Sequence, residues 1–143
     1  MADRFMSEVK ALEIMRDLTS SAFANRYSEV KSRPFFELKD AFLWAVAIGV
    51  QEAKKTPLQG KKDGVFFTKN LNDDQRAFLQ AVAIADSENL SLISDEDSVN
   101  SIAEEYANTG AYRLREILLG EHGDPLFNLV NVIRSESRKV EGQ

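Results

Sequence analysis

Apolar residues recur at helical spacing along most of the chain, and this pattern predicts a series of helices. The first is an amphipathic helix over residues 7–23, with charged residues on the face opposite its apolar stripe. The second, over residues 38–53, is apolar almost all round, which is typical of a helix at the centre of a fold. Small residues at positions 41, 45, 47 and 49 would allow neighbouring helices to approach this helix closely.

A clear start signal precedes the third predicted helix, over residues 74–87. Asn72 can cap its first turn, and the acidic residues that follow suit the positive end of the helix dipole. The periodicity of this segment predicts that Phe78 and Leu79 are both buried.

The last third of the chain is expected to hold three more helical segments. Ser94 caps a helix that Asn108-Thr109-Gly110 is expected to end or bend, because Gly and Asn are favoured at helix C-termini. A short helix follows over residues 112–119, and a final one begins at Pro125. The polar tail beyond Ser135 is expected to fray.

Strand signals are weak. Residues 54–64 indicate a loop by their Pro and Gly content, and residues 65–67 form a short apolar run after it that suits an extended segment or an anchoring turn. Residues 90–93 have near-strand spacing and could pair with that run. The prediction is therefore an all-α fold: a compact bundle of about five to six helices with at most one short β pair.

The chain length suits a single helical domain that spans residues 1–143. With no cysteine, neither a disulfide nor a thiolate metal site can form. The most apolar stretch, residues 41–50, is about half the length of a membrane span, and the N-terminal region lacks the continuous apolar segment of a signal peptide. We therefore expect a cytoplasmic protein with no membrane association.

Charge is unevenly distributed along the chain. The net charge of −5 argues against bulk binding to nucleic acid. However, residues 1–72 carry 12 Lys and Arg against 9 Asp and Glu, whereas residues 73–143 carry 6 against 14. A local basic site in the first half is compatible with this distribution.

The positive charge concentrates between the second and third predicted helices. The candidate nucleic-acid-binding residues there are Lys54, Lys55, Lys61, Lys62 and Lys69. Their functional interpretation is a loop that contacts phosphates, and the alternative, which we favour, is a solvated surface loop. Phe66 and Phe67 lie in the same segment and are expected to anchor it to the core.

Two groupings of side chains are catalytic candidates. Glu104 and Glu105 are adjacent on a predicted helix and point about 100° apart, which favours a structural role, with one of them holding a backbone amide or Arg113. His122 and Asp124 superficially resemble a base and its orienting carboxylate, but Asp124 is explained as a helix cap. We predict no enzyme activity, no metal site and no cofactor.

Three blocks of sequence carry a resemblance to a known family. They are FELKDAF with AVAIG in residues 36–49, FLQAVAIA with LISDE in residues 78–96, and IAEEYAN with Gly110 and GDPL in residues 102–126. Together they resemble the DNA phosphorothioation-associated protein 4 family, small proteins linked to bacterial Dnd-type DNA sulfur-modification and restriction systems. The resemblance covers residues 34–133 and leaves residues 1–33 as an N-terminal helical extension and residues 135–143 as a frayed tail.

The resemblance implies a bacterial protein of antiphage defence and supplies no catalytic residues. We therefore expect a non-enzymatic accessory protein whose partners are proteins of a DNA modification or restriction complex. Direct DNA contact and homo-oligomers are left open. One alternative is a DNA-binding or regulatory protein that uses the basic loop, residues 54–69. Another is a small hydrolase or nuclease centred on Glu104, Glu105, His122 and Asp124.

Overall fold

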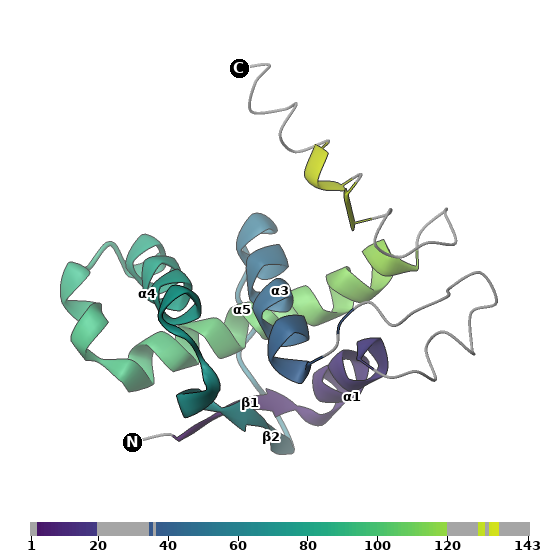
Figure 1. Ribbon diagram of the computed structural model, residues 1–143, viewed down its shortest axis with the longest axis horizontal. Helices are drawn as coiled ribbons and strands as arrows, with labels where there is room; N and C mark the ends of the chain where they lie inside the picture. Colours follow the sequence, from purple (N-terminus) through teal and green to yellow (C-terminus); the bar gives the residue numbers. More distant parts are fainter. Residues whose placement is uncertain (1–2, 20–34, 36, 120–128, 131, 135–143) are drawn as a thin grey trace.

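The computed structural model describes residues 3–19, 35, 37–119, 129–130 and 132–134. Within them the fold is mostly helical with one antiparallel pair of strands, as predicted (Figure 1). No helix in these ranges is both long and apolar enough to cross a membrane. In chain order the elements are β1 (Arg4–Glu8), α1 (Val9–Leu18), α3 (Leu38–Gln51), β2 (Lys62–Phe67), η1 (Thr68–Asn70), α4 (Asp73–Ser87), η2 (Leu90–Ser94) and α5 (Glu96–Leu118).

The close crossing of α3 and α5 is the centre of the fold (Figure 1). Two glycines make this approach possible, because a Cβ on Gly49 would overlap the carbonyl oxygen of Tyr106 and a Cβ on Gly110 would overlap that of Ala45. Gly49 of α3 therefore has the role predicted for it, and the backbones of the two helices touch at this point.

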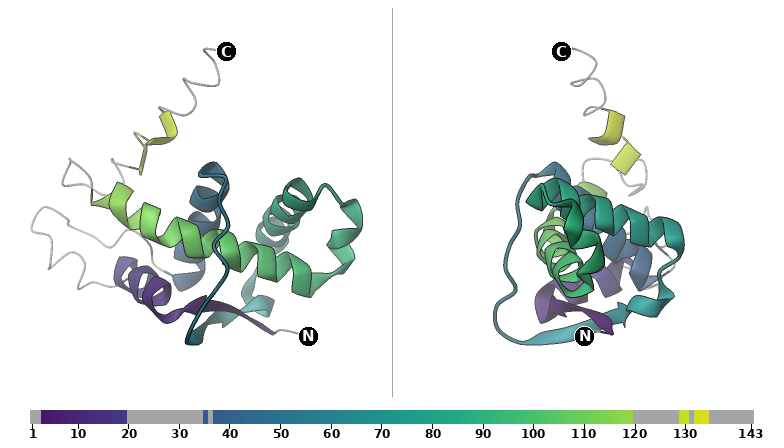
Figure 2. Two further views of the ribbon diagram at one scale, coloured as in Figure 1. Left: turned by 180° about the vertical axis from the view of Figure 1, so that it is seen from behind. Right: turned by 90° about the vertical axis from the view of Figure 1, so that its left-hand side faces the viewer.

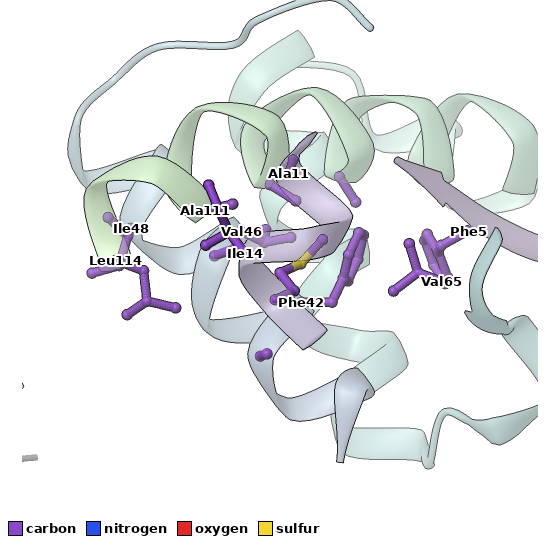
Figure 3. Packing of buried hydrophobic residues seen from close by; sticks show 14 of the residues in the cluster. Phe5, Ala11, Ile14, Phe42, Val46, Ile48, Val65, Ala111 and Leu114 are labelled. Carbon is purple, nitrogen blue, oxygen red and sulfur yellow. The ribbon is translucent and has the colours of Figure 1, made fainter. Parts of the chain in front are cut away.

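Side chains from β1, α1, α3, β2 and α5 meet around this crossing in one hydrophobic core (Figure 3). Three aromatic rings close the end of the core under the strands. The ring centroid of Phe5 lies 4.9 Å from those of both Phe42 and Phe66, and the latter two are 5.3 Å apart. These rings fix the strand pair to α3.

The β pair exists, but the predicted partner is wrong. Residues 62–67 pair with β1, so that Arg4 lies opposite Phe67 and Glu8 opposite Lys62, with an irregularity between Phe5 and Met6. The segment over residues 90–93 instead belongs to the 3-10 helix η2. Burial alternates along β1, where Phe5 and Ser7 face the core. The segment is too short for this alternation to be recognised as a strand in the sequence.

The first helix is shorter than predicted. It begins at Val9, since Ser7 belongs to β1, and Thr19 is its C-cap; the rest of the predicted helix lies outside the described residues. Its apolar stripe is buried, and Leu12, Met15 and Leu18 are each no more than 1% exposed. Residues 9–18 are therefore an integral part of the core.

The two helices predicted on either side of Gly110 are wrong. Residues 96–118 form the single helix α5, and its N-cap is Asp95 rather than Ser94. Gly110 has a local tendency to end a helix, but it lies inside α5 because the crossing with α3 leaves no space for a side chain. The predicted final helix is described only at residues 129–130 and 132–134, which are helical, and Pro125 lies outside the described residues.

The predicted start of α4 is confirmed. Asn72 and Gln75 form a reciprocal capping box, in which each side chain accepts a hydrogen bond from the backbone N–H of the other. Leu79 is buried as predicted, but the prediction for Phe78 is wrong, since its side chain is 37% exposed. The face of α4 that α5 covers is narrower than the apolar pattern suggested.

Candidate functional site

The connection between α3 and β2, residues 52–61, crosses α5 and is called the strap here (Figure 2). Hydrogen bonds attach it to the middle of that helix. The Thr56 N–H donates to the Glu105 carbonyl at 3.1 Å, and the hydroxyls of Thr56 and Thr109 lie 2.7 Å apart. The side-chain amide of Asn108 donates to the Thr56 carbonyl at 3.1 Å. A segment with little apolar content is thereby held against α5 by polar contacts.

Strand β1 is attached to the same stretch of α5. The Glu104 carboxylate accepts a hydrogen bond of 2.6 Å from the Met6 N–H. The Glu8 carboxylate accepts two, one of 2.6 Å from the Asn108 side chain and one of 3.1 Å from the Gln59 N–H in the strap. Glu8 therefore joins strand, strap and helix at one point.

Burial raises the pKa of the Glu104 carboxyl. The hydrogen bond from the Met6 amide and the charge of Lys62 oppose this effect, whereas the neighbouring charge of Glu105 adds to it. The group is held in a specific hydrogen bond, and its negative charge is disfavoured by its surroundings.

A second polar cluster attaches α4 to α5 and to the strap. Asp86 accepts hydrogen bonds of 2.8 Å from both the Tyr106 hydroxyl and the Lys55 ammonium. Burial acts to raise the pKa of Asp86, but these two hydrogen bonds and the charge of Lys55 outweigh it and hold the pKa below its usual value. The pKa of Tyr106 is raised by burial and by its hydrogen bond to the Asp86 carboxylate.

Together these contacts explain the most distinctive part of the sequence, residues 104–110. Glu104 holds β1, Tyr106 holds α4, Asn108 holds both β1 and the strap, and Gly110 allows α3 to approach. Glu104 therefore has the structural role predicted for one member of the acidic pair, because its carboxylate holds a backbone amide. Arg113 does not take part, because it pairs instead with two other glutamates of the surface.

The five candidate lysines are divided among the strap, β2 and η1. Lys55 pairs with Asp86, and Lys62 lies opposite Glu8 in the strand register and close enough to Glu104 to affect its pKa. Lys54 and Lys61 are exposed near the two ends of the strap, and no ion pair joins either to a described residue. Two of the five thus face carboxylates, and a role for the set in binding nucleic acid stays a prediction.

Lys69 lies in a different setting that the sequence did not reveal. Its ammonium lies 5.6 Å from the ring centroid of Phe67. Phe67 is in turn the partner of Arg4 in the antiparallel pair of β1 and β2. Phe67 was expected to anchor the loop to the core, but that holds only for Phe66, and the Phe67 side chain is 47% exposed. The alternation of a strand sends two adjacent phenylalanines to opposite faces, and the pairing that decides which one is buried is not visible locally.

The catalytic alternative that combined Glu104 and Glu105 with two further residues stays a hypothesis. His122 and Asp124 lie outside the described residues. Among the described residues, no group of three or more His, Cys, Asp or Glu side chains is arranged to hold a metal ion.

A groove of about 460 Å³ lies between α1 and α5. Its lining carries both signs of charge, with Lys10 and Arg115 against Glu13 and Asp17, and with Tyr112 beside them. Burial and the charge of Glu8 raise the pKa of Tyr112. The opposed charges on its walls balance, so the groove favours neither anions nor cations.

Comparison with known proteins gives one match. The family model for DNA sulphur modification system-associated protein 4 matches residues 13–143. This match begins inside α1 and continues beyond the region that carried the sequence resemblance. No match was found among curated proteins or among solved structures.

Proposed function

Because the chain belongs to the DNA sulphur modification system-associated protein 4 family, we propose that it is a non-enzymatic accessory protein of such a system that acts through protein contacts. The family description supports association with the system. The mode of action rests on what the surface offers and on how the polar groups of the interior are used.

Exposed apolar side chains at one end of the molecule carry this proposal. Phe78 of α4 and Leu90 and Ile93 of η2, called the α4–η2 corner here, are 37%, 72% and 43% exposed. This end of the molecule is remote from α1 (Figure 1). Single exposed leucines are ordinary, whereas three large apolar side chains on two adjacent elements offer apolar area that a protein partner can cover, and this supports the proposal.

The backbone around Leu90 is fixed by its own hydrogen bonds. The Asn89 carboxamide oxygen accepts from both the N–H and the hydroxyl of Ser91, at 3.0 and 2.7 Å. The Ser94 hydroxyl donates to the Ser91 carbonyl at 2.9 Å. The turn thus holds Leu90 outward in an ordered conformation, which lowers the entropic cost of binding a partner there.

The half-buried carboxylates support the same view. Glu8, Glu104 and Asp86 each accept hydrogen bonds that join separate segments of the chain. Their arrangement serves the fold, and this favours an accessory role over chemistry at these groups.

The test measures binding of the purified chain to each purified protein of a DNA sulphur modification or restriction system, by calorimetry. One of these proteins is expected to bind, and Leu90→Ser together with Ile93→Ser is expected to weaken that binding about tenfold or more. Val50→Ser is the matched control, since Val50 is 40% exposed at the end of α3. Binding to none of the proteins, or equal binding by the corner variant, would contradict the proposal.

Duplex DNA binding through the strap is the alternative function. The exposed positions of Lys54 and Lys61 favour it, since each lacks an ion pair with the described residues. Its test compares duplex DNA with and without phosphorothioate linkages, at low and near-physiological salt, using a Lys54/Lys55/Lys61/Lys62 charge-removal variant. Salt-sensitive binding that the variant loses would favour this alternative, and no binding at low salt would remove it.

A further inference from the structure

One end of the β ribbon combines an exposed aromatic ring with two cations. Arg4 and Phe67 are partners in the antiparallel register, so their side chains lie on the same face. Lys69, two residues beyond the end of β2, places its ammonium 5.6 Å from the centroid of the Phe67 ring. We call these three residues the ribbon end.

Packing does not explain the phenylalanine at this position. The core contacts of the ribbon are made by Phe66, whose ring lies against Phe5 and Phe42. Phe67 is 47% exposed and has no part in that cluster. Phe67 therefore presents an aromatic side chain to solvent, and the packing of the adjacent Phe66 fixes the strand that carries it.

The two cations are available for an anionic ligand. Arg4 and Lys69 are both exposed, and within the described part of the chain neither forms an ion pair with a carboxylate. The Arg4 side chain runs along the ribbon face over Gly64, where a Cβ would lie 2.9 Å from its Cδ, so the guanidinium lies beside the position opposite Met6. The ribbon end thus differs from Lys55 and Lys62, whose charges face carboxylates.

We propose that the ribbon end binds single-stranded DNA, with a base stacked on the Phe67 ring and its flanking phosphates held by Arg4 and Lys69. Aromatic rings beside cations are a recurring way to hold unpaired bases, because every base offers a π face. A duplex keeps its bases stacked on one another, so an exposed ring has no base face to meet. The net charge of −5 also disfavours the broad electrostatic contact that duplex binding requires.

This inference goes beyond the proposed function and does not depend on it. The ribbon end and the α4–η2 corner belong to different elements, so they can be varied separately. Substitutions at Leu90 and Ile93 are expected to leave DNA binding unchanged.

The test is fluorescence anisotropy of the full chain with a short labelled oligo(dT), at low and near-physiological salt. Binding is expected, with a slope of log affinity against log salt of about −1.4, the value for two phosphate contacts on a single strand. Phe67→Ala is expected to weaken binding roughly tenfold or more, and Phe67→Leu, which keeps the apolar surface but removes the ring, by a similar factor.

The charge contribution is tested with two double variants that change net charge equally. Arg4→Gln with Lys69→Gln is expected to abolish most of the salt-dependent binding, whereas Lys54→Gln with Lys61→Gln is expected to change it less than twofold. Thermal unfolding of each variant verifies that it is folded. No binding of oligo(dT) at low salt, equal losses in the two double variants, or full binding by Phe67→Leu would each overturn the proposal.

Discussion

The side-chain amide of Asn108 donates a hydrogen bond of 2.6 Å to the carboxylate of Glu8 and thereby joins the middle of α5 to the end of β1. Asn108 is 4% exposed, and its second donor contact reaches the Thr56 carbonyl of the strap. Both N–H groups of the carboxamide are used, whereas its oxygen has no hydrogen-bond partner in the described structure. The Glu8 carboxylate and the Thr56 carbonyl both need a hydrogen-bond donor, and the small carboxamide of asparagine supplies two.

Asn108→Asp is expected to be strongly destabilising at neutral pH. The substitution keeps the shape of the side chain but places a second carboxylate against Glu8 and the Thr56 carbonyl, where both donors are lost. We expect the free energy of unfolding to fall by about 3 kcal/mol, and by about 2 kcal/mol for Asn108→Ala. Urea unfolding followed by circular dichroism measures both, with exposed Asn70→Asp as the control. If Asn108→Asp were as stable as the unaltered chain, the role assigned to the two donors would be wrong.

Gly110→Ala is expected to disrupt the crossing of α3 and α5. The new methyl group would overlap the Ala45 carbonyl, and backbone cannot move aside as a flexible side chain can. A loss of about 3 kcal/mol or more is expected in chemical unfolding. Gly60→Ala is the control, because Gly60 has a φ of 74° and open space around it, and only backbone strain of about 1 kcal/mol is expected there. Equal effects of the two substitutions would contradict the account of the crossing.

Asp86→Asn is expected to destabilise the protein in a pH-dependent way. The pKa of Asp86 is lowered in the folded state, so its stabilising effect is present above its ordinary value of 3.8 and is lost as pH falls through the lower folded value. At neutral pH the variant is expected to be about 1–2 kcal/mol less stable than the unaltered chain. The difference should narrow in acid, and unfolding by urea across a pH series measures it. A difference that stays constant with pH would exclude this linkage.

Glu104→Gln is expected to show the opposite pH trend. The pKa of Glu104 is raised above its ordinary value of 4.5, chiefly by burial, so keeping the group charged in the folded state costs free energy at higher pH. Glutamine retains an oxygen for the Met6 N–H and carries no charge. The unfolding free energy of the variant minus that of the unaltered chain should therefore rise as pH increases from 4.5 into the range above the raised pKa. Lys62→Gln removes a charge that favours ionised Glu104. The same comparison of Glu104 with glutamine, made in a chain that carries Lys62→Gln, should therefore show a larger rise. A falling difference would show that the hydrogen bond outweighs burial.

Local signals in the sequence predicted the elements that local interactions determine. The cap at Asn72 marks the start of α4, and the nearly uniform apolar composition of residues 38–51 identifies α3 as central. In each case the residues that determine the structure lie within a few positions of one another.

The incorrect predictions concern residues whose roles depend on distant parts of the chain. Gly110 resembles a helix end, and only the carbonyl of Ala45 explains its place inside α5. Of the two adjacent phenylalanines in β2, the register with β1 decides that Phe66 is buried and Phe67 exposed. The ribbon end was missed for the same reason, because only that pairing brings Arg4 opposite Phe67, the residue beside Lys69.

The crossing of α3 and α5 has a consequence for the order in which the protein is made. Helix α3 leaves the ribosome well before α5, so the part of its apolar surface that α5 covers has no partner until synthesis has passed residue 110. The strap cannot make its hydrogen bonds to Glu105 and Thr109 until then either. A nascent chain that stops within η2 would contain α1, α3 and α4 but not the helix that covers them, and such a fragment is expected to aggregate or require a chaperone.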